Sequence, residues 1–513
     1  MNAPTELLRQ AEKAVAMANW PEARRRFLQV LEVVEHPDAL LHLSYIESNA
    51  DNYSLARAYA LRACAQRPRA PATVVRLLNR LRNFNEMGAI NWFIEQSPFL
   101  LDLDAQGLQV VSAQLSYMGE QQKAVQYLDR AIARRPGVPQ LLLARAQVKV
   151  FLGLFDEAEQ DLAECLKLSP GMPNAWWTLA GLRKQTLSSN HVDQLRNLIA
   201  SRAHPAKDKT YLYYALHKEL DDLGDIPAAA QALDAACKAQ RSELKYSDAQ
   251  TRALFRQLKA MPTGAKSSAR AGFTPVFVVG MYRSGTTLLE QLIGGNPNIL
   301  NAGELQDMTG CMRNAVDHYC HGVTDEMVIA RAKGVDFTQV GMQYLHGVSW
   351  RLNGHTHITD KWPPNTMNVG FICQALPDVK VIHMTRDPVE TCFSILREMF
   401  SGAAQYSYDQ TELASYYLQY QDLMRHWHER FPGRILDVDY ARLTTDTEQV
   451  MREVSEFCGF SFLPTMLDPR SASRSVATAS AVQVRGPVVS RAKAKWEPYR
   501  EYLQPLITGL GLQ

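Results

Sequence analysis

The sequence predicts a two-part fold in which an N-terminal all-α solenoid is followed by an α/β domain with a central parallel sheet. Residues 1–245 are rich in Ala, Leu, Arg and Gln and follow one helical pattern after another. Within them a sequence pattern recurs with a fixed period. After residue 273, short β-branched runs alternate with turns and helical patterns, which is typical of a parallel sheet covered by helices.

The repeat is clearest in two segments of the first half, "MGEQQKAVQYLDRAIARRP" (Met118–Pro136) and "LGLFDEAEQDLAECLKLSP" (Leu152–Pro170), whose equivalent residues lie 34 positions apart. Small Gly and Ala residues allow two helices to approach closely, and a proline ends the second helix. Because of this period and pattern, residues 1–245 resemble the tetratricopeptide repeat family. The resemblance implies a solenoid whose concave surface binds a protein partner.

The repeat register is lost near Tyr246, and "MPTGAKSSARAG" has the composition of an exposed linker. We therefore expect three parts: a helical repeat domain over 1–245, a linker over 246–272, and an α/β domain over 273–513.

The composition is that of an ordinary globular protein, with 46% apolar and 21% charged residues. A formal net charge of +2 gives no indication of nucleic-acid binding, so any anion site must be local. The eight cysteines are scattered without a C-x-x-C pair, which argues against a zinc knuckle or a disulfide framework and fits a reducing compartment. The sequence shows neither a signal peptide nor a long apolar run, and it predicts a cytoplasmic protein without a membrane span.

The stretch "TPVFVVGMYRSGTTLLE" has the order strand, glycine-bearing loop and helix that a P-loop-like phosphate site requires. The backbone N–H groups of residues 283–287 and the helix dipole can bind an anion, and Arg283 adds a bidentate cation. Gly285 permits close approach of the anion. Hydroxyl donors come from Ser284, Thr286 and Thr287.

Thr286 stands where a nucleotide kinase would carry its lysine, and no strand ends in paired acidic residues that could hold a metal. The loop therefore suits a single phosphate better than a magnesium-bound triphosphate.

This loop resembles the 5′-phosphosulfate loop of the sulfotransferases, in the branch of the protein-tyrosine sulfotransferases and of bacterial tetratricopeptide–sulfotransferase fusions. The family pattern is Pro-[Arg/Lys]-Ser-Gly-Thr-Thr, and Tyr282 replaces its proline here. The resemblance implies 3′-phosphoadenosine 5′-phosphosulfate (PAPS) as the sulfuryl donor, with no metal required.

The resemblance also implies a site for the 3′-phosphate of that donor. Arg386 follows a predicted strand in "VKVIHMTRDP", and Ser394 lies eight residues on, which is the family's spacing. The family has a further arginine where Glu398 stands, and Arg397 is adjacent, so its contact with the 3′-phosphate stays open. The C-terminal segment "TASAVQVRGPVVSRAKAKWEPY" resembles the part of the family that covers the nucleotide, with Ser480 and Lys495 as donor-binding residues.

Sulfuryl transfer to a hydroxyl requires a base and cations near the transferred group. Glu304 in "NAGEL" lies 21 residues after Arg283, where the tyrosine-sulfotransferase branch has its catalytic glutamate. We expect Glu304 as general base. Lys361 in "ITDKWPPN" would stabilise developing charge together with Arg283.

The expected function is PAPS-dependent sulfuryl transfer to a hydroxyl acceptor, which could be a peptide or protein tyrosine, a glycan, a lipid or a small metabolite. Two alternatives remain at this point. One is a tetratricopeptide scaffold with a non-catalytic nucleotide-binding module, and the other is a nucleotide kinase with an unusual loop.

Overall fold

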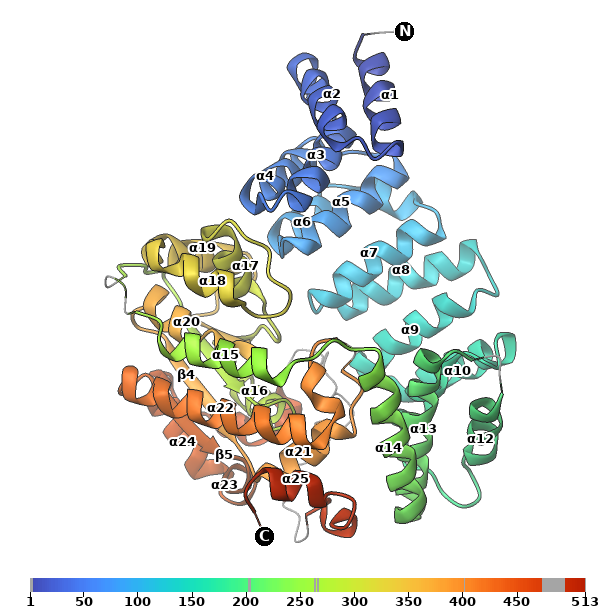
Figure 1. Cartoon of the computed structure of the whole chain (residues 1–513), viewed down its shortest axis with the longest axis vertical. Coiled ribbons are helices and arrows are strands. Elements are labelled where there is room, and N and C mark those ends of the chain that lie inside the picture. Colours follow the sequence, from blue (N-terminus) through green and yellow to red (C-terminus); the bar gives the residue numbers. More distant parts are fainter. Residues whose placement is uncertain are drawn as a thin grey trace. The chain divides into compact units, whose positions relative to one another are not determined.

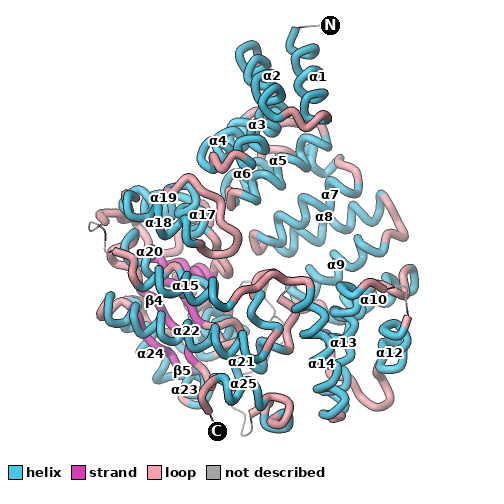
Figure 2. The backbone as a smooth tube through the Cα atoms, viewed as in Figure 1, coloured by secondary structure: helices cyan, strands magenta, loops and turns pink. Residues whose placement is uncertain are grey.

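The computed structural model describes residues 3–201, 204–262, 264, 267–400, 402–472 and 494–512. The described first half is helical, and a parallel sheet surrounded by helices follows it (Figures 1 and 2). The predicted fold class is therefore confirmed. None of the described helices is both long and apolar enough to cross a bilayer.

The chain divides by its internal contacts into two compact units. The first comprises residues 1–136, 264–270 and 306–351, and the second comprises 137–263, 271–305 and 352–513. Each unit contains several separate chain segments, so the units do not test the domain boundaries predicted at residues 245 and 273. Those boundaries stay predictions.

The first unit is built from helix pairs and three later helices. Its described helices are α1 (Ala3–Ala16), α2 (Trp20–Val33), α3 (Pro37–Asn49), α4 (Tyr53–Ala65), α5 (Pro71–Asn83), α6 (Met87–Glu95), α7 (Ala105–Tyr117), α8 (Gln121–Arg134), α17 (Asp307–Ala315), α18 (Glu326–Arg331) and α19 (Phe337–Ser349). Neighbours α1 and α2, α3 and α4, and α7 and α8 pack as hairpins.

The second unit begins with further helices of the first half. They are α9 (Pro139–Leu152), α10 (Phe155–Leu168), α11 (Pro173–Leu182), α12 (Val192–Ala200), α13 (Ala206–Leu223), α14 (Ile226–Ser242) and α15 (Asp248–Lys259). Gly153 ends α9 in the left-handed conformation with φ 80°, so the glycine predicted by the repeat occupies a helix C-terminus.

A polar side chain links the two helices of a repeat hairpin in equivalent places. The Ser44 hydroxyl donates to the carbonyl of Ala56 at 2.7 Å, and the Ser112 hydroxyl donates to the carbonyl of Ala124 at 2.8 Å. Both alanines are fully buried, as the close approach of the helices requires. These two bonds are 68 residues apart in the chain, which is twice the predicted period.

The sheet has five parallel strands in the order β2-β3-β1-β4-β5. Their bounds are β1 (Thr274–Gly280), β2 (Ile299–Asn301), β3 (His357–Lys361), β4 (Lys380–Thr385) and β5 (Ile435–Asp439). The helices of this region are α16 (Thr286–Ile293), α20 (Val369–Ala375), α21 (Pro388–Leu396), α22 (Gln410–Arg430), α23 (Tyr440–Thr445), α24 (Thr447–Cys458) and α25 (Gln504–Gly509).

The sheet is buried on both faces, as its continuous apolar strands predict. Val276 and Val278 of β1 share one apolar cluster with Leu289 of α16 and Met451 of α24. The opposite face carries His383 of β4, whose ring contacts α22. The carboxyl ends of the parallel strands therefore meet at one edge, where ligands bind in open α/β sheets.

The segment expected to be a linker begins with the packed helix α15. Phe255 of α15 is buried with its ring centroid 5.4 Å from that of Tyr416, and Asp248 accepts a hydrogen bond from the Ser415 hydroxyl at 2.6 Å. The irregular part of the segment is therefore shorter than the sequence suggests.

Candidate functional site

The predicted anion loop joins β1 to α16 at the carboxyl edge of the sheet. β1 ends at Gly280 and α16 begins at Thr286, with Gly285 as its N-cap at φ 108°. Arg283 adopts a left-handed φ of 65°, a conformation that residues other than glycine rarely adopt and that is often found at functional sites. The strand, loop and helix follow in the order that the sequence predicts.

Close neighbours fix the shape of this loop. A Cβ atom on Gly285 would lie 2.4 Å from the Tyr440 ring, and one on Gly280 would lie 2.8 Å from the carbonyl oxygen of Met384. The Ser284 hydroxyl donates to the Met281 carbonyl at 2.8 Å. Glycine is thus required by packing at both positions, and the loop is held against β4 and Tyr440. The predicted hydroxyl residues Ser284, Thr286 and Thr287 are all buried.

The residues of the two predicted cationic sites are in direct contact. Arg386 donates from Nη1 to the backbone carbonyl of Arg283 at 3.0 Å, and Arg283 donates from Nε to the Ser394 hydroxyl at 3.2 Å. Ser394 is positioned by α21, whose N-cap is Asp387; the Asp387 carboxylate accepts from the Glu390 amide at 2.7 Å. The Arg386 guanidinium also lies 4.4 Å from the centre of the Tyr440 ring.

Two carboxylates, neither of them predicted as a site residue, lie beside these arginines. Glu390 accepts from Arg386 at 3.1 Å and from the backbone N–H of Lys495 at 2.9 Å, which places the predicted Lys495 at the site. Glu398 lies 4.0 Å from Arg283, and burial raises the pKa of its carboxyl. Arg386 precedes the N-cap of α21 and Glu390 lies in the first turn of that helix, so the helix start brings the two side chains together. Ser480 lies outside the described residues.

The predicted general base and the predicted lysine form an ion pair. Lys361, the last residue of β3, donates from Nζ to Oε1 of Glu304 at 2.7 Å. The lysine side chain is 1% exposed and the glutamate side chain is 38% exposed. The Lys361 amide also donates to the Gly303 carbonyl at 2.9 Å, which fixes the turn after β2 that carries Glu304. A buried cation thus orients a carboxylate that solvent can reach.

A buried glutamate supports this turn. Glu290 of α16 accepts from the Gly303 amide at 2.9 Å and from the Thr359 hydroxyl at 2.8 Å. Its side chain therefore ties the helix of the anion loop to the turn that carries Glu304. A charged residue on the otherwise buried face of "LLEQLI" was the sequence signal for such a role.

An aromatic side chain lies beside Glu304. Tyr282, which replaces the proline of the motif, has its ring centroid 4.8 Å from that of Phe400. Burial, and then the charge of Glu304, raise the pKa of the Tyr282 hydroxyl well above its usual range. This side chain therefore stays neutral and contributes an apolar surface next to the candidate base.

Arg397 is held by the helical region of the same compact unit. It donates from Nε to Nε2 of His217 at 3.0 Å and pairs with Asp221, and both partners lie on α13. Asp221 also accepts from the Tyr499 hydroxyl at 2.6 Å. Burial works to raise the pKa of Asp221, but the charge of Arg397 and the Tyr499 hydroxyl hold it below its usual range.

His217 occupies the hairpin position that holds serine in earlier repeats. Its Nδ1 lies 2.9 Å from the Ala229 carbonyl, twelve residues on, as Ser44 and Ser112 do with their alanines. Burial, and then the Arg397 charge, lower the pKa of His217 to about 4. The ring is therefore neutral, donates through Nδ1 and accepts from Arg397 through Nε2.

Three guanidiniums gather at this edge. Burial lowers the pKa of Arg283, and the neighbouring charges of Arg386 and Arg397 lower it further against the opposing effect of Glu398. Such a cluster of cations favours a multiply charged anion between them. His217 and Asp221 of α13 contact Arg397 of this cluster. The sequence analysis predicted site residues only in the second half of the chain.

We expect Asp221→Asn to destabilise the protein and weaken anion binding. The change leaves the half-buried Arg397 without a charged partner, which costs about 1–3 kcal/mol. Urea unfolding should show this loss, and the dissociation constant for adenosine 3′,5′-bisphosphate should rise several-fold as Arg397 reorients. The matched control Asp234→Asn, which removes the charged partner of the exposed Lys238 on α14, should change neither value. Equal anion affinity in Asp221→Asn and wild type would show that α13 has no part in the site.

Two family models match separate parts of the chain. Residues 275–464 match the family model described as sulfotransferase family, and residues 139–171 match the tetratricopeptide repeat. The chain is 28% identical over 398 residues to an uncharacterized protein of Aquifex aeolicus (strain VF5), and the match covers 75% of this chain and 52% of that protein. The chain thus spans about half the length of this curated relative.

Solved structures of sulfotransferases and of a TPR protein are similar to parts of the chain. The sulfotransferase domain from the Synechococcus PCC 7002 olefin synthase is 17% identical, with 47% of this chain and 96% of that chain covered and a TM-score of 0.29. The sulfotransferase STF9 from Mycobacterium avium is 15% identical, with 61% and 95% covered and a TM-score of 0.26. The TPR protein YrrB is 14% identical, with 40% and 96% covered and a TM-score of 0.26. At TM-scores this low, these likenesses carry no conclusion about function.

Proposed function

We propose, from the match of residues 275–464 to the sulfotransferase family and from the site geometry, that the chain transfers a sulfuryl group from PAPS to a hydroxyl acceptor. The observation that carries the proposal is the junction of Arg283, Arg386 and Ser394 beside the anion loop. It joins two cationic sites at one sheet edge, as a donor with anionic groups at both ends requires.

The chemistry of the residues present fits this donor. The loop from Arg283 to Thr287 and the N-terminus of α16 would hold the 5′-phosphosulfate. Arg386 and Ser394 would hold the 3′-phosphate, and Lys495 and Ser480 would bind the nucleotide from the C-terminal segment. The donor supplies a sulfuryl group whose bond to the phosphate oxygen breaks as the acceptor oxygen bonds to sulfur.

The Glu304–Lys361 pair provides the proton transfer and the charge that this reaction needs. Glu304 is exposed enough to reach an acceptor hydroxyl and would take its proton as general base. Lys361 holds that carboxylate in place and contributes a fixed positive charge near the transferred group, together with Arg283. Glu290 keeps the turn that carries Glu304 rigid.

The acceptor that we would test first is a peptide or protein tyrosine. The apolar surface of Tyr282 and Phe400 beside Glu304 suits an aromatic ring, and the repeat region suits a protein partner.

A reducing cytoplasmic setting is supported by the eight cysteines, which are all buried as free thiols.

The direct test is transfer of label from ³⁵S-labelled PAPS to a panel of tyrosine peptides, glycans, lipids and phenols in the presence of EDTA. Label on any acceptor, dependent on active protein, supports the proposal. Transfer from ATP that requires Mg²⁺ would instead support the kinase alternative. Donor binding without transfer to any acceptor would support the scaffold with a non-catalytic module.

Arg386→Ala should weaken binding of adenosine 3′,5′-bisphosphate by about ten- to a hundred-fold, because one charge-assisted contact is lost. Isothermal titration calorimetry in EDTA would measure this change. Arg442→Ala is the matched control, since Arg442 pairs with Glu453 on the domain surface. If both variants bound the nucleotide equally well, Arg386 would have no role in the donor site.

A further inference from the structure

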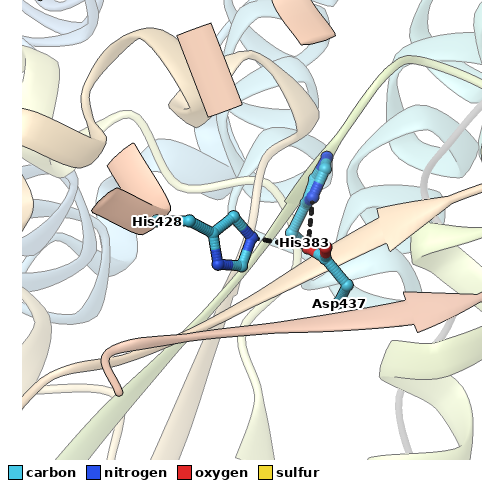
Figure 3. Close-up of side chains that lie close together, drawn as sticks. All are labelled: His383, His428 and Asp437. Carbon is cyan, nitrogen blue, oxygen red and sulfur yellow. Dashed lines mark hydrogen bonds and ion pairs between the residues drawn. The ribbon is translucent and has the colours of Figure 1, made fainter. Parts of the chain in front are cut away.

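Two histidines and an aspartate converge on the face of the sheet that α22 covers. Nδ1 of His383 lies 2.7 Å from Oδ1 of Asp437, and Nε2 of His428 lies 2.8 Å from the same oxygen. Figure 3 shows both rings directed at this carboxylate. The three candidate ligand atoms all lie within 4.8 Å of one another. The helical pattern around His428 is that of a solvated helix face, but its ring is held by the Asp437 carboxylate.

The fold fixes each member of this cluster. His383 and Asp437 are paired residues in the register of β4 and β5, so their side chains leave the sheet side by side. His428 comes from the last turns of α22, whose position is set by the buried Trp427 and its hydrogen bond to the Thr366 carbonyl at 3.1 Å. Three elements therefore contribute one ligand atom each.

The second nitrogen of His383 is also occupied. Nε2 contacts the hydroxyl of buried Tyr420, so Nδ1 is the nitrogen directed at the cluster. Metal-binding histidines in proteins almost always have their other ring nitrogen held in this way, which fixes the tautomer and the orientation of the ring.

We propose that His383, His428 and Asp437 form a binding site for a divalent transition metal ion, with Zn²⁺ as the best match. Two imidazoles and one carboxylate are a ligand set that zinc accepts, with a fourth position for water. Zinc bonds of about 2.0–2.1 Å separate tetrahedral ligand atoms by about 3.3 Å, so each of the two nitrogen–oxygen spacings needs to open by about half an ångström.

The open side of the cluster suits such a fourth ligand. The Asp437 side chain is 52% exposed and the His428 side chain is 35% exposed, whereas His383 is 6% exposed. Solvent therefore reaches the carboxylate, and a metal ion can approach the cluster from this side. A bound ion would join β4, β5 and α22 and thereby fix the strand that leads into Arg386. The sulfuryl transfer proposed above needs no metal, so this site is independent of it.

The test is a zinc titration of the full-length protein after EDTA treatment and desalting, in competition with a chromogenic zinc indicator. Wild type should bind one equivalent with a dissociation constant in the micromolar range or tighter. His428→Ala and Asp437→Asn should each weaken binding at least ten-fold, and both changes lie at accessible positions that spare the buried His383. His426→Ala, two residues away on the same helix, is the matched control and should bind as wild type does.

Cobalt gives a second readout, because a tetrahedral site produces visible absorption bands that the His428→Ala variant should lack. Substoichiometric zinc binding by the wild type, or equal affinity in wild type and both variants, would overturn the proposal. These measurements use the metal alone, so they are decided independently of the outcome of any sulfuryl-transfer assay.

Discussion

Glu304→Gln should lower kcat by about 10²–10⁴-fold while the affinity for adenosine 3′,5′-bisphosphate stays within two-fold of wild type (roughly the range for losing a general base). Glutamine keeps an oxygen that can accept from Lys361, so the geometry of the turn is retained, but it cannot take a proton. Steady-state kinetics with the acceptor found in the transfer assay, combined with calorimetric donor binding, would measure both effects.

The same variant should also lose stability, because the buried ammonium of Lys361 would face a neutral amide. Glu429→Gln, at an exposed position of α22, is the matched control for the charge change. An unchanged kcat in Glu304→Gln would remove this residue as the base, and a large loss of nucleotide affinity would place it in donor binding instead.

Lys361→Met should lower kcat by about 10²–10³-fold, the effect typical of removing one fixed donor that stabilises transition-state charge. Methionine fills much of the space of the lysine stem but carries no charge. The effect on stability should be smaller than that of Glu304→Gln, because the carboxylate left behind is 38% exposed and can be solvated.

Kinetics and urea unfolding of both variants would test this asymmetry between the two partners of the pair. Lys333→Met, at an exposed position, serves as the control. A Lys361→Met variant with wild-type kcat, or one that is less stable than Glu304→Gln, would contradict the proposed division of roles.

The parts of the site that lie on consecutive elements could be predicted from the sequence. The anion loop follows from a local order of strand, glycine and helix, and Glu304 follows from its distance to that loop. Lys361 and Arg386 stand at or just after the ends of short β-branched strands, and parallel strands bring such ends to one edge.

The parts that depend on contacts between distant segments could not be predicted. Arg397 and Asp221 are 176 residues apart, and no periodic pattern relates them. The role of His217 depends on Arg397, the residue that caps the C-terminus of α21. The same holds for His428, whose exposure on a helical wheel says nothing about the neighbouring strand that carries Asp437.

The substitution of histidine for serine in the last hairpin has a consequence for how this chain can be divided. Repeat arrays are usually regarded as interchangeable adaptors that can be shortened or swapped without harm to an attached enzyme. Here a polypeptide starting at residue 273 would lack His217 and Asp221, the two α13 partners of Arg397. The positive charge of Arg397 near Arg283 would then lose both of these contacts. The final hairpin therefore forms one physical unit with the region around the anion loop.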